Sequence, residues 1–239
     1  MESILEHLRG EIITCQLEGG RRLNEIQLSS QLNVSRPPMR EAFQVLEQEH
    51  FVVSIPRKGR FVTELTAENY EKIHKARSMI ENYVIDLLKE KNIRDLPMVD
   101  LALETIRRKQ MPQDDPYERW HYLEAMGKFH LELVVSAKNE VLSRFYGIIR
   151  FNILRYQYWL RMLRSPHLFA PESVGFLTQE HSKVLALIKE GEFDEAKDCL
   201  KSHMDGTWEL MKRNLLEKEP VEVTPLSKIT LSPVVILNG

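Results

Sequence analysis

Two arginines early in the chain have a spacing that suits hydrogen bonding to one flat partner. Arg36 and Arg40 lie four residues apart and follow Ser35, a residue type favoured at helix starts. Side chains four apart share one helix face, and a guanidinium there can pair with O6 and N7 of guanine in the major groove. Ser35, at the start of the same helix, suits a phosphate oxygen. The segment predicts a helix whose first turn contacts duplex DNA.

A second basic cluster follows in a segment with turn residues. Arg57, Lys58 and Arg60 surround Gly59, and residues 51–63 contain no acidic side chain. β-branched and aromatic residues flank this turn on both sides, which is typical of a hairpin. A positively charged hairpin tip suits the minor groove or the flanking phosphates.

The charge balance limits what these clusters show. The 239 residues include 33 Lys and Arg against 35 Asp and Glu, a net charge of −2, which excludes a nucleic-acid binder that is basic over its whole surface. Residues 1–65 alone hold 8 basic and 9 acidic side chains. On charge alone, a solvated helix face explains the arginines equally well, and it is the order of the surrounding elements that favours DNA.

Three histidines in the second half have the spacing of a metal site. His181 and His203 each lie about eleven residues from the middle of a turn at 189–193. In an antiparallel helical pair both imidazoles would then lie at one level, roughly 16 Å from the turn at 1.5 Å per residue. His130, on another helix, can complete a set of three nitrogen ligands. The alternative is that these are ordinary core or surface residues, since the chain has 8 histidines.

The elements that position the arginines follow a known order. Apolar residues recur with helical spacing in three segments, and two β-rich runs come next. The expected helices are 2–16, 25–32 and 35–49, and the expected strands are 51–55 and 60–63. Three helices and a hairpin are the plan of a winged helix-turn-helix domain, which we place at residues 1–65.

The rest of the chain predicts helices only. A helix begins near residue 66, and further helices are expected at 94–109, 117–137, 138–163, 173–190 and 193–217. The fold class is therefore mainly α: a winged helix-turn-helix with a small β-hairpin, then an all-α helical bundle at 66–217. Residues 218–239 contain three prolines and no helical period, which predicts an extended or mobile tail.

Residues 4–63 resemble the DNA-binding domain of the GntR family of bacterial transcriptional regulators. The resemblance rests on ILEHLRGEIITCQLEGGRRLNE, VSRPPMREAFQVLEQEHFV and PRKGRFV. It implies that Arg36 and Arg40 read bases, that Ser35 touches the backbone or a base, and that Lys58 and Gly59 form the wing tip. The chain departs from the family at Ile26, where an arginine that helps to bind DNA is common.

Residues of about 70–215 resemble the all-helical effector-binding domain (FCD) of the FadR subfamily. The segments are ARSMIENYVIDLL, KFHLELVVSAKNEVL and EHSKVLALIKEGEFDEAKDCLKSHM. The resemblance implies a divalent metal, often Zn²⁺ or Ni²⁺, held by one Asp and three His. The histidine positions match His130, His181 and His203, and the Asp position is Met126. A thioether is at most a weak, soft ligand, so affinity for hard cations should fall, while three histidines can still hold zinc.

The same resemblance points to residues around an effector. Arg77 matches an arginine that faces the pocket in many relatives, and a guanidinium there suits a carboxylate. The alternative for Arg77 is an internal salt bridge with Glu81, four residues on. Besides Arg77 and Met126, we expect Arg155 and Tyr156 to contact the effector.

These features favour a ligand-responsive transcriptional repressor. We expect a homodimer on a palindromic DNA operator, because two recognition helices together multiply a modest single-domain affinity. The effector would be a small organic acid. Two cysteines, Cys15 and Cys199, form no disulfide framework, and the sequence shows neither a signal peptide nor an apolar run of about 18 residues, so a cytoplasmic location without a membrane partner is expected.

Two other classes of protein are alternatives. The first is an enzyme that uses a His-ligated metal in the helical domain, but the sequence shows no general base at a fixed offset, no phosphate loop and no H-E-x-x-H. The second is an adaptor protein, which has no need of Arg36, Arg40 or an acid-free hairpin.

Overall fold

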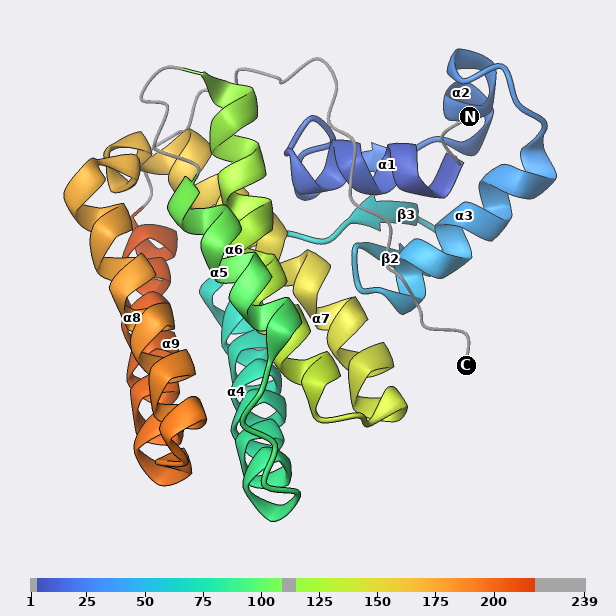
Figure 1. Cartoon of the computed structure of the whole chain (residues 1–239). Coiled ribbons are helices and arrows are strands. Elements are labelled where there is room, and N and C mark those ends of the chain that lie inside the picture. The colour runs from blue at the N-terminus through green and yellow to red at the C-terminus, as the bar shows by residue number, and fades with distance from the viewer. Residues whose placement is uncertain (1–3, 109–114, 218–239) are drawn as a thin grey trace.

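The computed structural model describes residues 4–108 and 115–217 (Figure 1). Its first part contains α1 (Ile4–Ile13), α2 (Glu25–Gln31) and α3 (Arg36–Gln48). Helix α2 begins at Asn24, whose side chain accepts hydrogen bonds from the backbone N–H groups of Ile26 and Gln27. Ser35 occupies the cap position before α3, and the two prolines that follow it fit a first turn where missing N–H groups cost little.

A three-stranded antiparallel sheet completes this part. Strand β3 (Gly59–Val62) lies between β1 (Arg22–Leu23) and β2 (Val52–Ile55), with Arg22 opposite Phe61 in the β1–β3 pair. The sequence predicted the β2–β3 hairpin only. Strand β1 was missed because two residues are too few to show an alternating pattern.

The second part is a bundle of helices. Its α-helices are α4 (Ala67–Glu90), α5 (Pro97–Arg108), α6 (Pro116–Ser136), α7 (Glu140–Tyr158), α8 (Pro171–Glu190) and α9 (Phe193–Leu216). The left-handed Gly191 ends α8, so α8 and α9 form the antiparallel pair expected from the sequence. No helix within the described ranges is both long and apolar enough to cross a lipid bilayer.

One expected helix is interrupted. Residues 138–163 do not continue as a single α-helix, because α7 gives way to a π-helix at Trp159–Arg164, where the N–H of Ser165 donates to the carbonyl of Leu160. A short 3₁₀ helix follows at Pro166–Phe169, a stretch expected to be a loop. Pro166 has no N–H to extend the helix, which explains the break. The expected tail at 218–239 lies outside the described residues.

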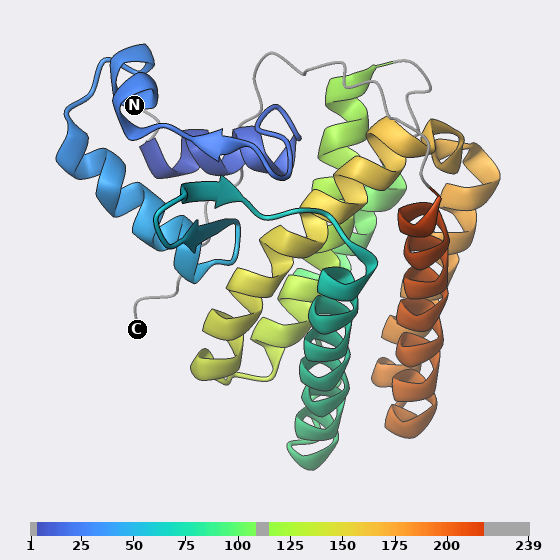
Figure 2. The same ribbon diagram turned by 180° about the vertical axis from the view of Figure 1, so that it is seen from behind.

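Helix α7 lies between the DNA-binding part and the rest of the bundle (Figures 1 and 2). The side-chain amide of Asn152 on α7 donates to the backbone carbonyl of Glu49 at 2.8 Å. Arg9 on α1 donates twice to the Glu49 carboxylate, at 2.7 and 2.9 Å. A continuous apolar core also joins the two parts, from Leu8 and Phe43 to the bundle. The recognition helix is thus anchored against α7 at its C-terminal end.

Candidate functional site

One carboxylate organises the arginines at the start of α3. Glu25, the first residue of α2, accepts hydrogen bonds from Nε of Arg36 at 2.7 Å and from Nε of Arg40 at 2.9 and 3.0 Å. A guanidinium nitrogen of Arg60 lies 4.0 Å from the same carboxylate. Arg36 and Arg40 are half exposed while Glu25 is largely covered. The two arginines therefore share one outward face, as the i, i+4 spacing predicted.

The remaining expected DNA contacts flank this pair. The hydroxyl of Ser35 makes no capping hydrogen bond and its residue is exposed, so it is available to a phosphate. Arg57 and Lys58 are exposed at the hairpin turn, which is closed by a hydrogen bond from the N–H of Lys58 to the carbonyl of Ile55 at 3.0 Å. Gly59 has φ +108°, a conformation that favours glycine.

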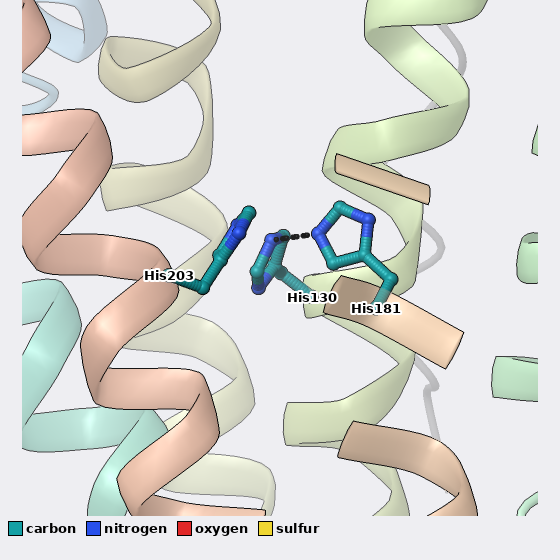
Figure 3. Close-up of side chains that lie close together, drawn as sticks. All are labelled: His130, His181 and His203. Atoms are coloured by element: carbon teal, nitrogen blue, oxygen red, sulfur yellow. Dashed lines mark hydrogen bonds between the residues drawn. The ribbon is translucent and has the colours of Figure 1, made fainter. Parts of the chain in front are cut away.

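The histidines predicted as a metal site come together inside the bundle. His130 on α6, His181 on α8 and His203 on α9 are all buried, and one ring nitrogen of each lies within 4.8 Å of the others. Figure 3 shows the three imidazoles pointing to a common point from three helices. The Nε2 atoms of His130 and His181 are 3.0 Å apart. Two nitrogens bound at 2.0–2.1 Å to a tetrahedral zinc ion would be about 3.3 Å apart, so this pair needs little adjustment.

Carboxylates hold two of these rings from behind. Nδ1 of His130 donates to Glu81 at 2.8 Å, and Nδ1 of His203 donates to Glu180 at 2.8 Å. With the proton on Nδ1, the Nε2 lone pair of each ring can bind an ion, as in histidine–carboxylate pairs at metal centres. Such an ion would replace the hydrogen bond between the Nε2 atoms of His130 and His181. The His181 Nδ1 atom has no hydrogen-bond partner among the described residues. The donor set fits a dication of the zinc type.

The protonation states also fit a metal ligand set. Burial, with the positive charge of Arg77, lowers the pKa of His130 to about 4 despite the opposing carboxylate of Glu81. Burial, with the neighbouring rings, holds the pKa of His181 well below its usual value. Both imidazoles are therefore neutral at physiological pH, which is the state that binds a metal.

Glu81 connects the histidines to Arg77. Its fully buried carboxylate accepts hydrogen bonds from Nε of Arg77 and from the hydroxyl of Tyr146, each at 2.6 Å, as well as from His130. Burial alone would raise the pKa of Glu81, but the charge of Arg77 and these hydrogen bonds hold it well below its usual value. The sequence allowed two roles for Arg77, a residue of the effector pocket or a partner of Glu81 in a salt bridge. The structure shows that Arg77 forms the salt bridge and also lines a cavity.

This cavity lies beside the histidines and is rich in arginine. Its lining residues come from α4, α6, α7, the π-helix, α8 and α9, and three of them are arginines. They are Arg77, Leu123, Glu124, Met126, Gly127, His130, Tyr146, Arg150, Ile153, Leu154, Gln157, Arg161, Leu177, His203 and Thr207. Arg77 is paired with Glu81, whereas Arg150 lies over the ring of Phe151 and near the charge of Glu124. The charge and shape of the lining suit a small anion. Sequence reasoning named neither Arg161 nor Glu180 and gave Arg150 no definite role, because nothing in the spacing distinguishes a cavity-facing side from a packed one.

Two expected effector residues lie elsewhere. Met126 lines the cavity, but Arg155 and Tyr156 do not. The Tyr156 hydroxyl contacts the backbone N–H and carbonyl of Thr66, each at 3.2 Å. Arg155 is buried beside Cys15 of the DNA-binding part. The physical reason is helical geometry: residues that follow Leu154 by one or two positions are rotated away from the cavity, Arg155 towards the DNA-binding part and Tyr156 towards the start of α4.

Comparison with known proteins decides the family. Residues 1–62 match the gntR family of bacterial regulatory proteins, and residues 72–206 match the FCD domain. The chain belongs to the GntR family of transcriptional regulators. The region that matches the gntR family contains Arg36 and Arg40, and the region that matches the FCD domain contains the three histidines. Membership in this family of regulators removes the enzyme alternative.

Two curated relatives resemble most of the chain, and a third resembles a shorter part of it. It is 26% identical to the HTH-type transcriptional regulator YdhC of Bacillus subtilis, over 88% of this chain and 90% of that protein. It is 26% identical to the Nta operon transcriptional regulator of Aminobacter aminovorans, over 77% and 81% respectively. Over 40% of this chain and 38% of its own length, the gluconate operon transcriptional repressor of Bacillus licheniformis is 34% identical.

Solved structures share the fold. A GntR regulator from Rhodococcus sp. RHA1 superposes with a TM-score of 0.69 at 21% identity, covering 87% of this chain and 95% of that one. McbR/YncC of E. coli gives a TM-score of 0.68 at 19% identity, with 89% and 99% coverage.

Proposed function

We propose that this chain is a metabolite-responsive repressor that binds a palindromic operator as a homodimer. Residues 1–65 would contact DNA, with Arg36 and Arg40 on bases, Ser35 on the backbone or a base, and Arg57, Lys58 and Gly59 at the wing tip. The supporting observation is the common outward face of Arg36 and Arg40 next to an exposed Ser35. Repression follows the relatives whose names state it, and dimerisation follows from the gain in affinity on a two-fold site.

We propose further that residues 66–217 sense a small organic acid. His130, His181 and His203 would hold Zn²⁺ or Ni²⁺, and the ion would offer a positive charge to a carboxylate in the adjoining cavity. The guanidinium of Arg150, which is not bonded to the buried Glu81 as Arg77 is, would offer a second. Met126 would pack against the ligand without binding the ion as an Asp would. Acid binding would then shift the population of domain arrangements and so change operator affinity.

The test is binding-site selection with the full chain on a random duplex pool. We expect a palindromic consensus and an affinity for it far above that for a scrambled duplex of equal length. Arg36→Ala and Arg40→Ala should each weaken binding by about 1–3 kcal/mol where the arginine reads a base. Lys72→Ala, which removes an exposed charge on α4, is the control. Selection that returns no preferred duplex at moderate salt would refute the proposed DNA-binding function.

A further inference from the structure

Glu25 is an acidic residue among three arginines on the surface that, in the proposed function, binds DNA. A carboxylate close to a phosphate backbone weakens binding by repulsion. Yet Glu25 sits directly between the two arginines that point outward from α3, with the Arg60 guanidinium next to it. The acid can favour DNA recognition here by fixing the orientation of the two guanidinium groups.

The atoms used in these contacts are informative. Glu25 binds Nε of both arginines. Each guanidinium therefore keeps its two terminal nitrogens, Nη1 and Nη2, for other partners. A pair of parallel N–H groups is the arrangement that meets O6 and N7 of guanine. Fixing the inner nitrogen also removes rotamer freedom that a long arginine would otherwise lose on binding.

We infer that Glu25 is a positioning residue for sequence recognition: it fixes Arg36 and Arg40 so that their terminal nitrogens face the bases end-on. It touches no base itself. It lowers affinity for DNA in general through its charge and raises the preference for the correct sequence. Hydrogen bonds from Arg40 and Arg36 hold the pKa of Glu25 below its usual value, so the carboxylate stays charged wherever the protein binds DNA.

The experiment compares two substitutions that remove the same charge. Glu25→Gln removes the charge at the arginine pair, whereas Glu41→Gln removes it from an exposed position on α3. Affinities are measured for the selected duplex and for a scrambled duplex across a salt series. Because each bidentate contact gives about 5- to 150-fold discrimination, we expect Glu25→Gln to lower the selected-to-scrambled ratio at least tenfold while binding to the scrambled duplex stays equal or increases.

The control should behave differently. Glu41→Gln should raise the affinity for both duplexes by the same factor and leave the selected-to-scrambled ratio unchanged. Glu25→Asp, which keeps the charge on a shorter side chain, should restore part of the ratio. If Glu25→Gln shifts both duplexes equally, as the control does, the positioning role is refuted. That outcome differs from failure of the proposed DNA-binding function, in which the wild type itself shows no preferred duplex.

A second inference rests on independent contacts in α7. The guanidinium carbon of Arg150, in the cavity, lies 4.7 Å from the ring centre of Phe151, and that of Arg9, on α1, lies 4.9 Å from the same ring centre. Arg9 in turn holds the carboxylate of Glu49, the residue that ends the recognition helix. The Phe151 ring thus contacts both Arg150, which lines the cavity, and Arg9, which binds the residue at the end of α3.

We propose that Phe151 and Arg9 transmit the state of the cavity to the recognition helix. This proposal rests on the proposed acid-sensing function. An anion that draws Arg150 off the ring would remove one of two cations that share Phe151, and the contact of Arg9 with the ring, together with its hold on Glu49, would change. Asn152, which also binds Glu49, keeps this end of α3 in register with α7.

Hydrogen exchange of the full chain without any effector tests this step. Arg150→Met should change exchange of the amides at 46–51 about two- to fivefold, the size expected from losing one cation–π contact. Arg9→Met, which also releases the carboxylate of Glu49, should raise exchange of these amides, and the effect of the double variant should differ from the product of the two single effects.

Lys212→Met is the matched control, since it removes a cation from the Trp208 ring on α9, and exchange at 46–51 should not respond. If Arg150→Met leaves these amides unchanged while Arg9→Met raises their exchange, transmission from the cavity is refuted. An acid that stabilises the protein but fails to alter DNA binding would instead refute the proposed regulation.

Discussion

The Nε2 atoms of His130 and His181 lie 3.0 Å apart in the interior of the bundle, with His203 stacked against His130. Three imidazoles with carboxylates behind two of them form a ready ligand set. We expect purified protein, stripped with chelator and reloaded, to bind one Zn²⁺ per chain in elemental analysis and to unfold at a higher temperature. His181→Ala should abolish both effects, whereas His121→Ala, which alters an exposed histidine on α6, should change neither. A loaded wild type without stoichiometric metal would contradict the site.

Arg77 should prove structural as well as functional. Arg77→Ala leaves the carboxylate of Glu81 buried without its cation, and breaking a buried pair in this way costs about 3–5 kcal/mol of unfolding free energy. Urea denaturation of the metal-free protein measures this loss. Arg77→Lys should recover part of the lost unfolding free energy, because a lysine restores the positive charge but not the planar set of N–H donors of a guanidinium. An Arg77→Ala variant as stable as wild type would show that Glu81 is held by its other partners alone.

Arg150 is the cleaner residue for testing acid binding. Unlike Arg77, it is not bonded to the buried carboxylate of Glu81, so Arg150→Ala should fold normally and lose the thermal stabilisation given by any acid that stabilises the wild type. The measurement is a thermal-shift screen of mono-, di- and tricarboxylates with and without chelator. A thermal shift that survives in Arg150→Ala would place the acid away from this guanidinium.

Ile26 offers a gain-of-affinity test. It is 65% exposed and follows Glu25 on α2, at a position where family members often carry an arginine. Ile26→Arg should add about one phosphate contact, strengthen binding to all duplexes and steepen the salt dependence by about one unit of slope. Ile26→Gln, polar but uncharged, is the control. Unchanged salt dependence would mean that this part of α2 stays away from the backbone.

Cys15 reports on the contact between the two parts. Burial raises its pKa to about 11, although Arg155 opposes the shift, so at pH 8 the thiol stays protonated and covered. Alkylation by iodoacetamide should be slow in the wild type. Arg9→Ala removes the cation that lies over the Phe151 ring of α7, together with two hydrogen bonds to Glu49 within the DNA-binding part, and should accelerate labelling of Cys15. Lys75→Ala, an exposed change on α4, should not. Equal labelling rates would show that Arg9 does not hold the domains together.

Much of this protein follows from local patterns. Helical periodicity, Ser35 before two prolines, and a basic turn between β-rich runs suffice for the winged helix-turn-helix, because each depends on residues close in sequence. His181 and His203 each lie about eleven residues from the middle of the turn at 189–193. In an antiparallel helical pair, this spacing places the two imidazoles at about one level. The Arg36 and Arg40 face follows from the i, i+4 rule alone.

Only the tertiary structure decided which partner each side chain meets. Glu25 binds both arginines across 11 and 15 residues, and Glu81 and Glu180 hold the histidines across 49 and 23. Helix α7 presents Arg150 to the cavity and Arg155 to the DNA-binding part, although the two are only five residues apart. Local spacing fixes how residues are arranged around one helix, but which side faces a cavity depends on how helices distant in sequence pack to bury apolar surface.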